Sequence, residues 1–141
     1  MSLTTVELLK ILNSKNSIDD YLEAASEEMN QDTLPEYLEK CIARSGLSKS
    51  QIIRRSGLDR IYAYQIFSGK KQNPVRDKLI RLAFGMKLTI DDTQNLLKTA
   101  GKSPLSPRNQ RDSIILFALL HQANVINCDE LLEAKGESIL R

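Results

Sequence analysis

The sequence is poor in the residue types on which many catalytic and metal sites depend. Its 141 residues include no tryptophan, one histidine and two cysteines. The single histidine, His121, excludes a metal site built on two histidines, and Cys41 and Cys128 are not at metal-ligand spacing. Six glycines and four prolines are too few for a loop-rich or disordered chain, and 5% aromatic residues leave an aliphatic core.

Long apolar runs and catalytic motifs are also missing. The longest apolar run, residues 114–120, is far shorter than the ~20 residues that cross a bilayer. The start of the sequence has no signal-peptide pattern. It contains no phosphate-binding glycine loop, no dinucleotide turn and no paired nucleophile and histidine. We therefore expect a cytoplasmic protein with no membrane segment, no cofactor, no bound metal and no enzymatic activity.

Charges of both signs are present, but they are unevenly distributed. The chain carries 20 lysines and arginines against 18 aspartates and glutamates, a net charge of +2. Residues 47–87 hold ten of the basic residues and only two acids, whereas residues 1–31 hold two basic residues and six acids. The near-neutral total is therefore a cancellation, and the basic segment is suited to a polyanion such as DNA.

Helical signals cover the whole sequence and predict an all-α protein. Apolar residues recur at helical spacing, and capping side chains such as Ser48 and Asn127 precede expected helices. The glycines at 46, 57, 69, 85, 101 and 136 are expected to take the left-handed conformation that ends a helix. The expected helices cover residues 4–13, 18–29, 33–45, 48–56, 59–68, 74–84, 89–100, 107–121 and 127–135.

Residues 76–105 match residues 111–140 without a gap when the sequence is shifted by 35. Nine of the 30 positions are identical. Two interpretations stay open: two amphipathic helix pairs share a pattern by necessity, or one helical hairpin has been duplicated. In both, the end of the chain packs on the helices before it. The expected organisation is an acidic helical arm (1–31), a central domain (32–103) and a C-terminal helical hairpin (104–141).

Residues 47–69 carry the most informative pattern. Ser48 caps a first short helix and Gln51 caps back. Gly57 supplies a tight turn, and Asp59 caps a second short helix. Two helices joined by a short turn with glycine form the helix-turn-helix unit.

The residues that follow make the pattern more specific. With Gly-Lys-Lys-x-x-Pro at 69–74 and Arg-Asp-Lys-Leu-Ile-Arg-Leu-Ala at 76–83, residues 34–100 resemble the Cro/phage-repressor (Xre) type of helix-turn-helix protein. The resemblance implies a five-helix lambda-repressor-like domain between the N-terminal arm and the C-terminal hairpin. It also implies sequence-specific binding of double-stranded DNA, usually as a homodimer, in bacterial transcription regulation. Residues 111–119 look like an extended subgroup of such regulators.

One pair of positions departs from the family pattern. A small residue is usual where Ile53 stands, and a large aliphatic residue is usual where Ala63 stands. Since the two positions pack together in that family, one interpretation is that the sizes are exchanged and the helix crossing is preserved. The other is that the crossing angle differs and the DNA reader is degenerate.

The second short helix is expected to face DNA bases with Arg60, Ile61, Tyr64 and Gln65. Arg60 can form a bidentate contact with guanine, and Gln65 can form one with adenine. Ile61 can meet a thymine methyl group, and Tyr64 can reach a base or a phosphate. The alternatives are a solvated charge at Arg60 and a protein-binding patch formed by Ile61 and Tyr64.

Basic and polar residues that flank this helix are expected to contact DNA phosphates. These residues are Ser48, Lys49, Lys70, Lys71 and Gln72. Asn73 is expected to cap the next helix. By contrast, Arg54, Arg81 and Lys87 are expected on solvated helix faces.

Alternatives also stay open for the partners and the thiols. The acidic arm can pack on the chain's own core, form a dimer surface or mask the basic segment. Cys41 is expected in the core, whereas Cys128 lies in a first helical turn, where the helix dipole can lower a thiol pKa and permit redox sensing. The alternative to DNA binding is a protein-interaction or antitoxin-like module that uses Ile61, Tyr64 and either the acidic arm or the C-terminal hairpin.

Overall fold

The computed structural model describes residues 4–14, 18 and 32–141. The chain divides into two compact units, Met1–Asp32 and Thr33–Arg141. The first contains helix α1 (Thr5–Ser14), where the Glu7 amide donates to the Thr4 hydroxyl (3.1 Å), as the sequence predicts. The helix expected at residues 18–29 lies outside the described residues.

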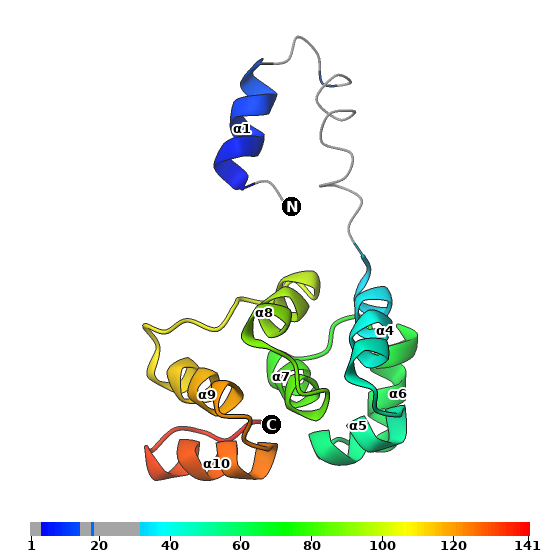
Figure 1. Ribbon diagram of the computed structural model, residues 1–141, viewed down its shortest axis with the longest axis vertical. Coiled ribbons are helices and arrows are strands. Elements are labelled where there is room, and N and C mark those ends of the chain that lie inside the picture. The colour runs from blue at the N-terminus through cyan, green and yellow to red at the C-terminus, as the bar shows by residue number, and fades with distance from the viewer. Residues whose placement is uncertain (1–3, 15–17, 19–31) are drawn as a thin grey trace. The chain divides into compact units, whose positions relative to one another are not determined.

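Every regular element among the described residues is an α-helix, which confirms the all-α expectation. Each end of a helix within the described residues lies within three residues of its expected position. The second unit consists of α4 (Leu34–Ser45), α5 (Lys49–Ser56), α6 (Arg60–Ser68), α7 (Arg76–Gly85), α8 (Ile90–Thr99), α9 (Gln110–Leu120) and α10 (Val125–Ala134) (Figure 1).

Side chains fix most helix starts as the sequence predicts. Ser48 and Gln51 form a reciprocal capping box at α5, and the Asp59 carboxylate accepts from the Tyr62 amide at α6. Two expected caps are wrong. Asn127 lies inside α10, which starts after Asn124 because the Asn124 side chain already accepts from the Asn127 amide (2.8 Å).

The second wrong cap is Asn73, which does not start α7. The residue before α7 is Val75, which has extended backbone and no side-chain cap. Asn73 instead accepts a 2.7 Å hydrogen bond from Lys102 Nζ. This contact joins the loop before α7 to the segment after α8, so the amide acts between elements rather than within one.

Gly85 is the one expected helix-ending glycine that does not take a left-handed conformation. It is the last residue of α7, and the left-handed residue is Lys87, with φ 55°. A Cβ at position 85 would overlap the Ser56 hydroxyl and lie 2.7 Å from the Ile52 carbonyl oxygen. Glycine is therefore required here because α5 approaches the backbone of α7 closely.

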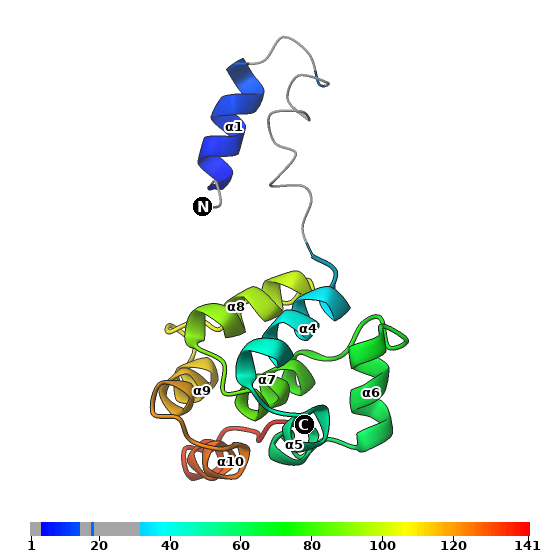
Figure 2. The ribbon, with the colours of Figure 1, turned by 45° about the vertical axis from the view of Figure 1, so that its right-hand side comes forward.

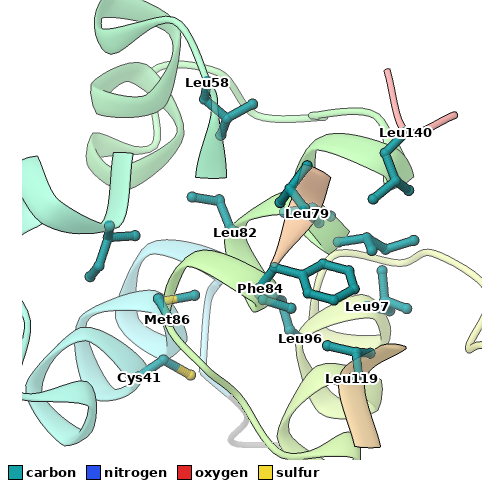
Figure 3. Packing of buried hydrophobic residues seen from close by; sticks show 14 of the residues in the cluster. Cys41, Leu58, Leu79, Leu82, Phe84, Met86, Leu96, Leu97, Leu119 and Leu140 are labelled. Carbon is teal, nitrogen blue, oxygen red and sulfur yellow. The ribbon is translucent and has the colours of Figure 1, made fainter. Parts of the chain in front are cut away.

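Helices α7 and α8 lie between the α4–α6 group and the α9–α10 pair in both views of the ribbon (Figures 1 and 2). Their side chains supply much of the aliphatic core, with Cys41 from α4 and Leu119 from α9 packed into the same cluster (Figure 3). Leu140, near the end of the chain, is also only 2% exposed. Because buried side chains come from α9, α10 and the residues after them, these segments are part of the core. Burying one such aliphatic side chain contributes about 1.5–3 kcal/mol.

The two hairpins, α7–α8 and α9–α10, have the same backbone features at positions 35 residues apart. Lys87 and Gln122 are both left-handed non-glycine residues, with φ 55° and 54°. After each second helix an amide closes the turn in the same way: Lys102 to the Leu97 carbonyl (2.8 Å) and Glu137 to the Leu132 carbonyl (2.9 Å). The sequence match therefore has a counterpart in the backbone at these two turns.

Reciprocal arginine–aspartate pairs join the two hairpins. Arg76 of the first hairpin binds both carboxylate oxygens of Asp112 at 3.0 Å, and Arg111 of the second binds those of Asp77 at 3.0 and 3.1 Å. Burial acts to raise the pKa of Asp112, but hydrogen bonds from Arg76 and from the Ser106 amide outweigh it and hold that pKa below its usual value. These bidentate pairs fix the second hairpin to the first.

Arg81 does not lie on a solvated helix face, so the expectation from the sequence is wrong for this residue. Its side chain is 16% exposed. Its Nε donates to the Ser56 carbonyl (3.0 Å), and a terminal nitrogen donates to the Leu140 carbonyl (2.9 Å). Arg81 therefore ties the end of α5 and the end of the chain to α7.

Candidate nucleic-acid interface

Helices α5 and α6 are joined by a turn of three residues, 57–59. Gly57 is left-handed (φ 65°) and its amide donates to the Arg54 carbonyl at 3.2 Å. Helix α6 buries Ala63, Ile66 and Phe67, so one side of this short helix is held in the core. The opposite side is consequently presented to solvent.

The exposed side of α6 carries the four expected base-reading residues. Arg60 is exposed, Ile61 is 71% exposed, Tyr64 is 36% exposed and Gln65 is half-buried. Positions i, i+1, i+4 and i+5 share one face of a helix, so the structure brings these side chains together. The Arg60 guanidinium lies 5.7 Å from the centre of the Tyr64 ring, which steadies its long side chain over that face.

Lysine side chains from neighbouring elements also contact the aromatic rings of α6. Lys49 Nζ, at the start of α5, lies 5.9 Å from the Phe67 ring centre. Lys71 and Lys78 lie 5.8 and 5.9 Å from the Tyr62 ring centre. We call Lys49, Arg60, Lys71 and Lys78 the α6 cation set. The lysines of this set come from α5, the loop after α6 and α7, so three separate elements place positive charge beside one helix.

The loop after α6 places the remaining expected phosphate contacts. Lys70, Lys71 and Gln72 are all exposed, and the Lys71 amide donates to the Gln65 carbonyl (2.9 Å), which anchors the loop to α6. At the start of α5 the Ser48 oxygen accepts from the Gln51 amide (3.1 Å), so its O–H can still donate to a phosphate. The expected phosphate-contacting residues thus lie at the start of α5 and just after α6.

Two residues of this surface were missed from the sequence. Glu39 of α4 forms an ion pair with Lys49 (Oε1 to Nζ, 2.9 Å), so a carboxylate competes with any phosphate for Lys49. Lys78 belongs to the basic segment, but no sequence signal places it beside Tyr62. Both contacts depend on how α4 and α7 pack against α5 and α6, and no local pattern reports that packing.

The thiols take no part in this surface. Cys41 is fully buried, as expected. Cys128 is also fully buried, and burial, with a smaller contribution from Asp129, raises its pKa to about 12. The redox-sensing interpretation of Cys128 is therefore wrong, because a thiol with such a pKa is protonated and inaccessible.

Among the described residues, no group of histidine, cysteine, aspartate or glutamate side chains could hold a metal ion. None of the described helices is long and apolar enough to cross a membrane. No model of a known protein family matches this chain, and no curated protein or solved structure matches it either.

Proposed function

We propose that this protein binds double-stranded DNA in a sequence-specific manner and acts as a bacterial transcriptional regulator in the cytoplasm. In this proposal α5 and α6 form the helix-turn-helix unit of a five-helix lambda-repressor-like domain, α4–α8. The observation that carries the proposal is the α6 cation set, which surrounds an exposed helix face of polar and aromatic side chains. Lysine and arginine heads around one helix are the usual electrostatic footprint of a DNA-binding surface.

Helix α6 is the element that would enter the major groove. Residues at the start of such a helix read bases, and Arg60 and Ile61 are its first two residues. In this proposal exposed Arg60 would form a bidentate contact with guanine, and Gln65, five residues further along the helix, would meet adenine. The 71% exposure of Ile61 offers an apolar contact for a thymine methyl group.

The phosphate contacts would fix the position of α6 without reading sequence. Lys70 and Lys71 would contact the backbone beyond the end of α6, and Lys49 and Ser48 would contact it at the start of α5. Since proteins with this unit usually bind as dimers, we expect a homodimer with two α6 helices about one DNA turn apart and a palindromic site.

A protein-interaction or antitoxin-like module is the second candidate function. The observation that favours it is the exposure of large apolar side chains, with Ile61 71% exposed on α6 and Phe117 and Leu120 51% and 66% exposed on α9. Exposed apolar side chains bind protein where they gather into a patch, and each of these two helices offers a starting point for one. A protein partner would bury Ile61 without using Lys70 or Lys71, whereas DNA binding would use both lysines for phosphate contacts.

A selection from random-sequence duplexes at low salt separates the two functions. The proposal predicts enrichment of a single palindromic motif whose half-sites lie about one helical turn apart. The Arg60→Ala variant then binds the duplex enriched by the wild-type chain more weakly. It also loses the wild-type preference at one base pair of the half-site. Retention of no duplex at low salt would overturn the proposal in favour of the protein-interaction module.

A further inference from the structure

The turns that join α7 to α8 and α9 to α10 line a pocket of about 600 Å³. Pockets that hold small molecules have volumes of about 300–1,000 Å³. The lining includes four pairs of residues 35 positions apart, Phe84 and Leu119, Lys87 and Gln122, Leu88 and Ala123, and Thr89 and Asn124. The pocket thus lies between equivalent parts of the two hairpins, and Arg55 of α5 completes it.

Apolar side chains make up one part of the pocket lining. Phe84 and Leu119, both seen in Figure 3, are 4% and 8% exposed, so they belong at once to the core and to the lining. Leu88 and Ile90 are half-buried beside them. A ligand in this pocket would therefore place an aliphatic or aromatic body against these side chains.

The polar part of the lining carries positive charge and amides. Arg55 and Lys87 are its two charged residues, and none of the described lining residues is acidic. Arg55 Nε donates to the Gly85 carbonyl (3.0 Å), which holds the guanidinium at the pocket and leaves its terminal nitrogens to donate elsewhere. Two cations with no carboxylate between them favour an anionic ligand over a neutral or cationic one.

Two residues of the pocket lining carry side chains at positions where the backbone conformation favours glycine. Lys87 and Gln122 are both left-handed, a conformation that disfavours residues with a Cβ, and both line the pocket. Strained residues of this kind concentrate at ligand sites. Replacing either residue with glycine removes its side chain without straining the backbone.

We propose that this pocket binds a small organic monoanion, a carboxylate with an aliphatic or aromatic body. Arg55 and Lys87 hold the carboxylate, Gln122 and Asn127 donate amide hydrogen bonds, and Phe84 and Leu119 contact the body. The proposal is independent of DNA binding, since every group it uses belongs to the pocket.

Calorimetric titration of the full chain tests the ligand class with octanoate and benzoate as probes. Octanamide and benzamide are matched controls of similar shape without charge. The proposal predicts that at least one acid binds and that its amide binds about tenfold more weakly, because a charge-assisted hydrogen bond is lost. Equal binding by an acid and its amide, or no saturable binding of either acid at millimolar concentration, overturns it.

Three variants locate the binding site. Lys87→Gly removes a cation and relaxes a left-handed residue, so its melting temperature is unchanged or higher while the bound acid binds about tenfold more weakly. Ala123→Leu narrows the pocket with the residue that the first hairpin holds at the equivalent position, Leu88, and weakens binding. Arg54→Gln, at an exposed residue of α5 outside the pocket, leaves binding unchanged. Wild-type affinity in Lys87→Gly, or equal weakening in Arg54→Gln, overturns the assignment.

Discussion

Two groups of basic side chains in residues 33–141 differ in what they contact. In the hairpins, Arg76, Arg81 and Arg111 are only 22%, 16% and 19% exposed and lie against carboxylates. Around α6, Arg60 and Lys71 are exposed and lie over aromatic rings. The first group is paired within the chain, whereas Arg60 and Lys71 present their charge to solvent.

The difference shows why a net charge is a poor guide to a binding surface. Residues 47–87 contain ten lysines and arginines, but Arg76 and Arg81 of this segment are engaged by Asp112 and Asp129. Only the exposed members can attract a polyanion. We therefore expect substitutions in the two groups to act on different properties, the stability of the fold in one and DNA affinity in the other.

The largest effect is expected from Arg76→Ala. It leaves buried Asp112 without its arginine partner and removes hydrogen bonds to two backbone carbonyls, so the free energy of unfolding falls by on the order of 3 kcal/mol. Urea denaturation followed by circular dichroism measures this loss. In Arg60→Ala the same measurement changes by less than about 0.5 kcal/mol, since Arg60 is exposed. Equal losses in both variants would remove the distinction between the two groups.

The next effect concerns base reading by Arg60. Arg60→Ala weakens binding of the selected duplex by about 1–3 kcal/mol and relaxes preference at one base pair, because a bidentate contact is lost. Fluorescence anisotropy with a panel of single-base variants of the duplex measures both changes. Arg54→Ala is the control, and an equal loss there would show that Arg60 acts only through its charge.

Lys70 and Lys71 are expected to change the salt dependence of binding rather than its specificity. Each alanine substitution reduces the slope of log K against log salt by roughly 0.9, because one fewer counterion is released from the DNA. Titrations at four salt concentrations give the slope. Lys98→Ala, at an exposed lysine of α8, keeps the wild-type slope. A slope unaltered by either loop substitution contradicts the phosphate contacts.

Protonation tests the hairpin group separately. Because the pKa of Asp112 is lower in the folded chain than its ordinary value, its contribution to stability is complete above about pH 4 and is lost as the pH falls through the lower folded value. Urea denaturation between pH 6 and pH 3 should show this loss. The Asp112→Asn variant is less stable at pH 6 and has a flatter pH dependence; an identical profile would contradict the account.

The smallest effect is expected at Glu39, the carboxylate that pairs with Lys49 of the α6 cation set. Glu39→Gln frees Lys49 from its 2.9 Å ion pair, so binding of the selected duplex tightens about twofold, in line with the modest strength of exposed pairs. Glu130→Gln makes the same change of net charge at an exposed residue of α10. If both variants tighten binding equally, the effect is one of overall charge and Lys49 has no particular role.

Local features of the fold could be predicted from the sequence. The caps at Ser48 and Asp59 and the left-handed Gly57 depend on residues within a few positions of one another, and the expected helix ends follow from them. The exposed face of α6 was also predictable, because helical periodicity separates Ala63 and Ile66 from Arg60 and Ile61.

Contacts between elements could not be predicted in the same way. Gly85 has a helix-ending pattern in the sequence, but its role comes from the approach of Ser56 on another helix. Arg76 pairs with Asp112, 36 residues away in the sequence. The charge of Arg76 is therefore engaged within the fold, although it contributes to the net positive charge of residues 47–87. The same limit hid Glu39 beside Lys49, since a single sequence carries no signal for contacts between α4 and α5.

The central claim is that the exposed face of α6 and its surrounding cations form the DNA-binding surface. Two-dimensional NMR of the full chain, titrated with the selected duplex, tests it most directly by locating the amides whose shifts change. The account predicts the largest changes at residues 60–65, with further changes at Lys49, Lys70 and Lys71. Changes confined to α9 and α10, with α6 unaffected, would contradict it.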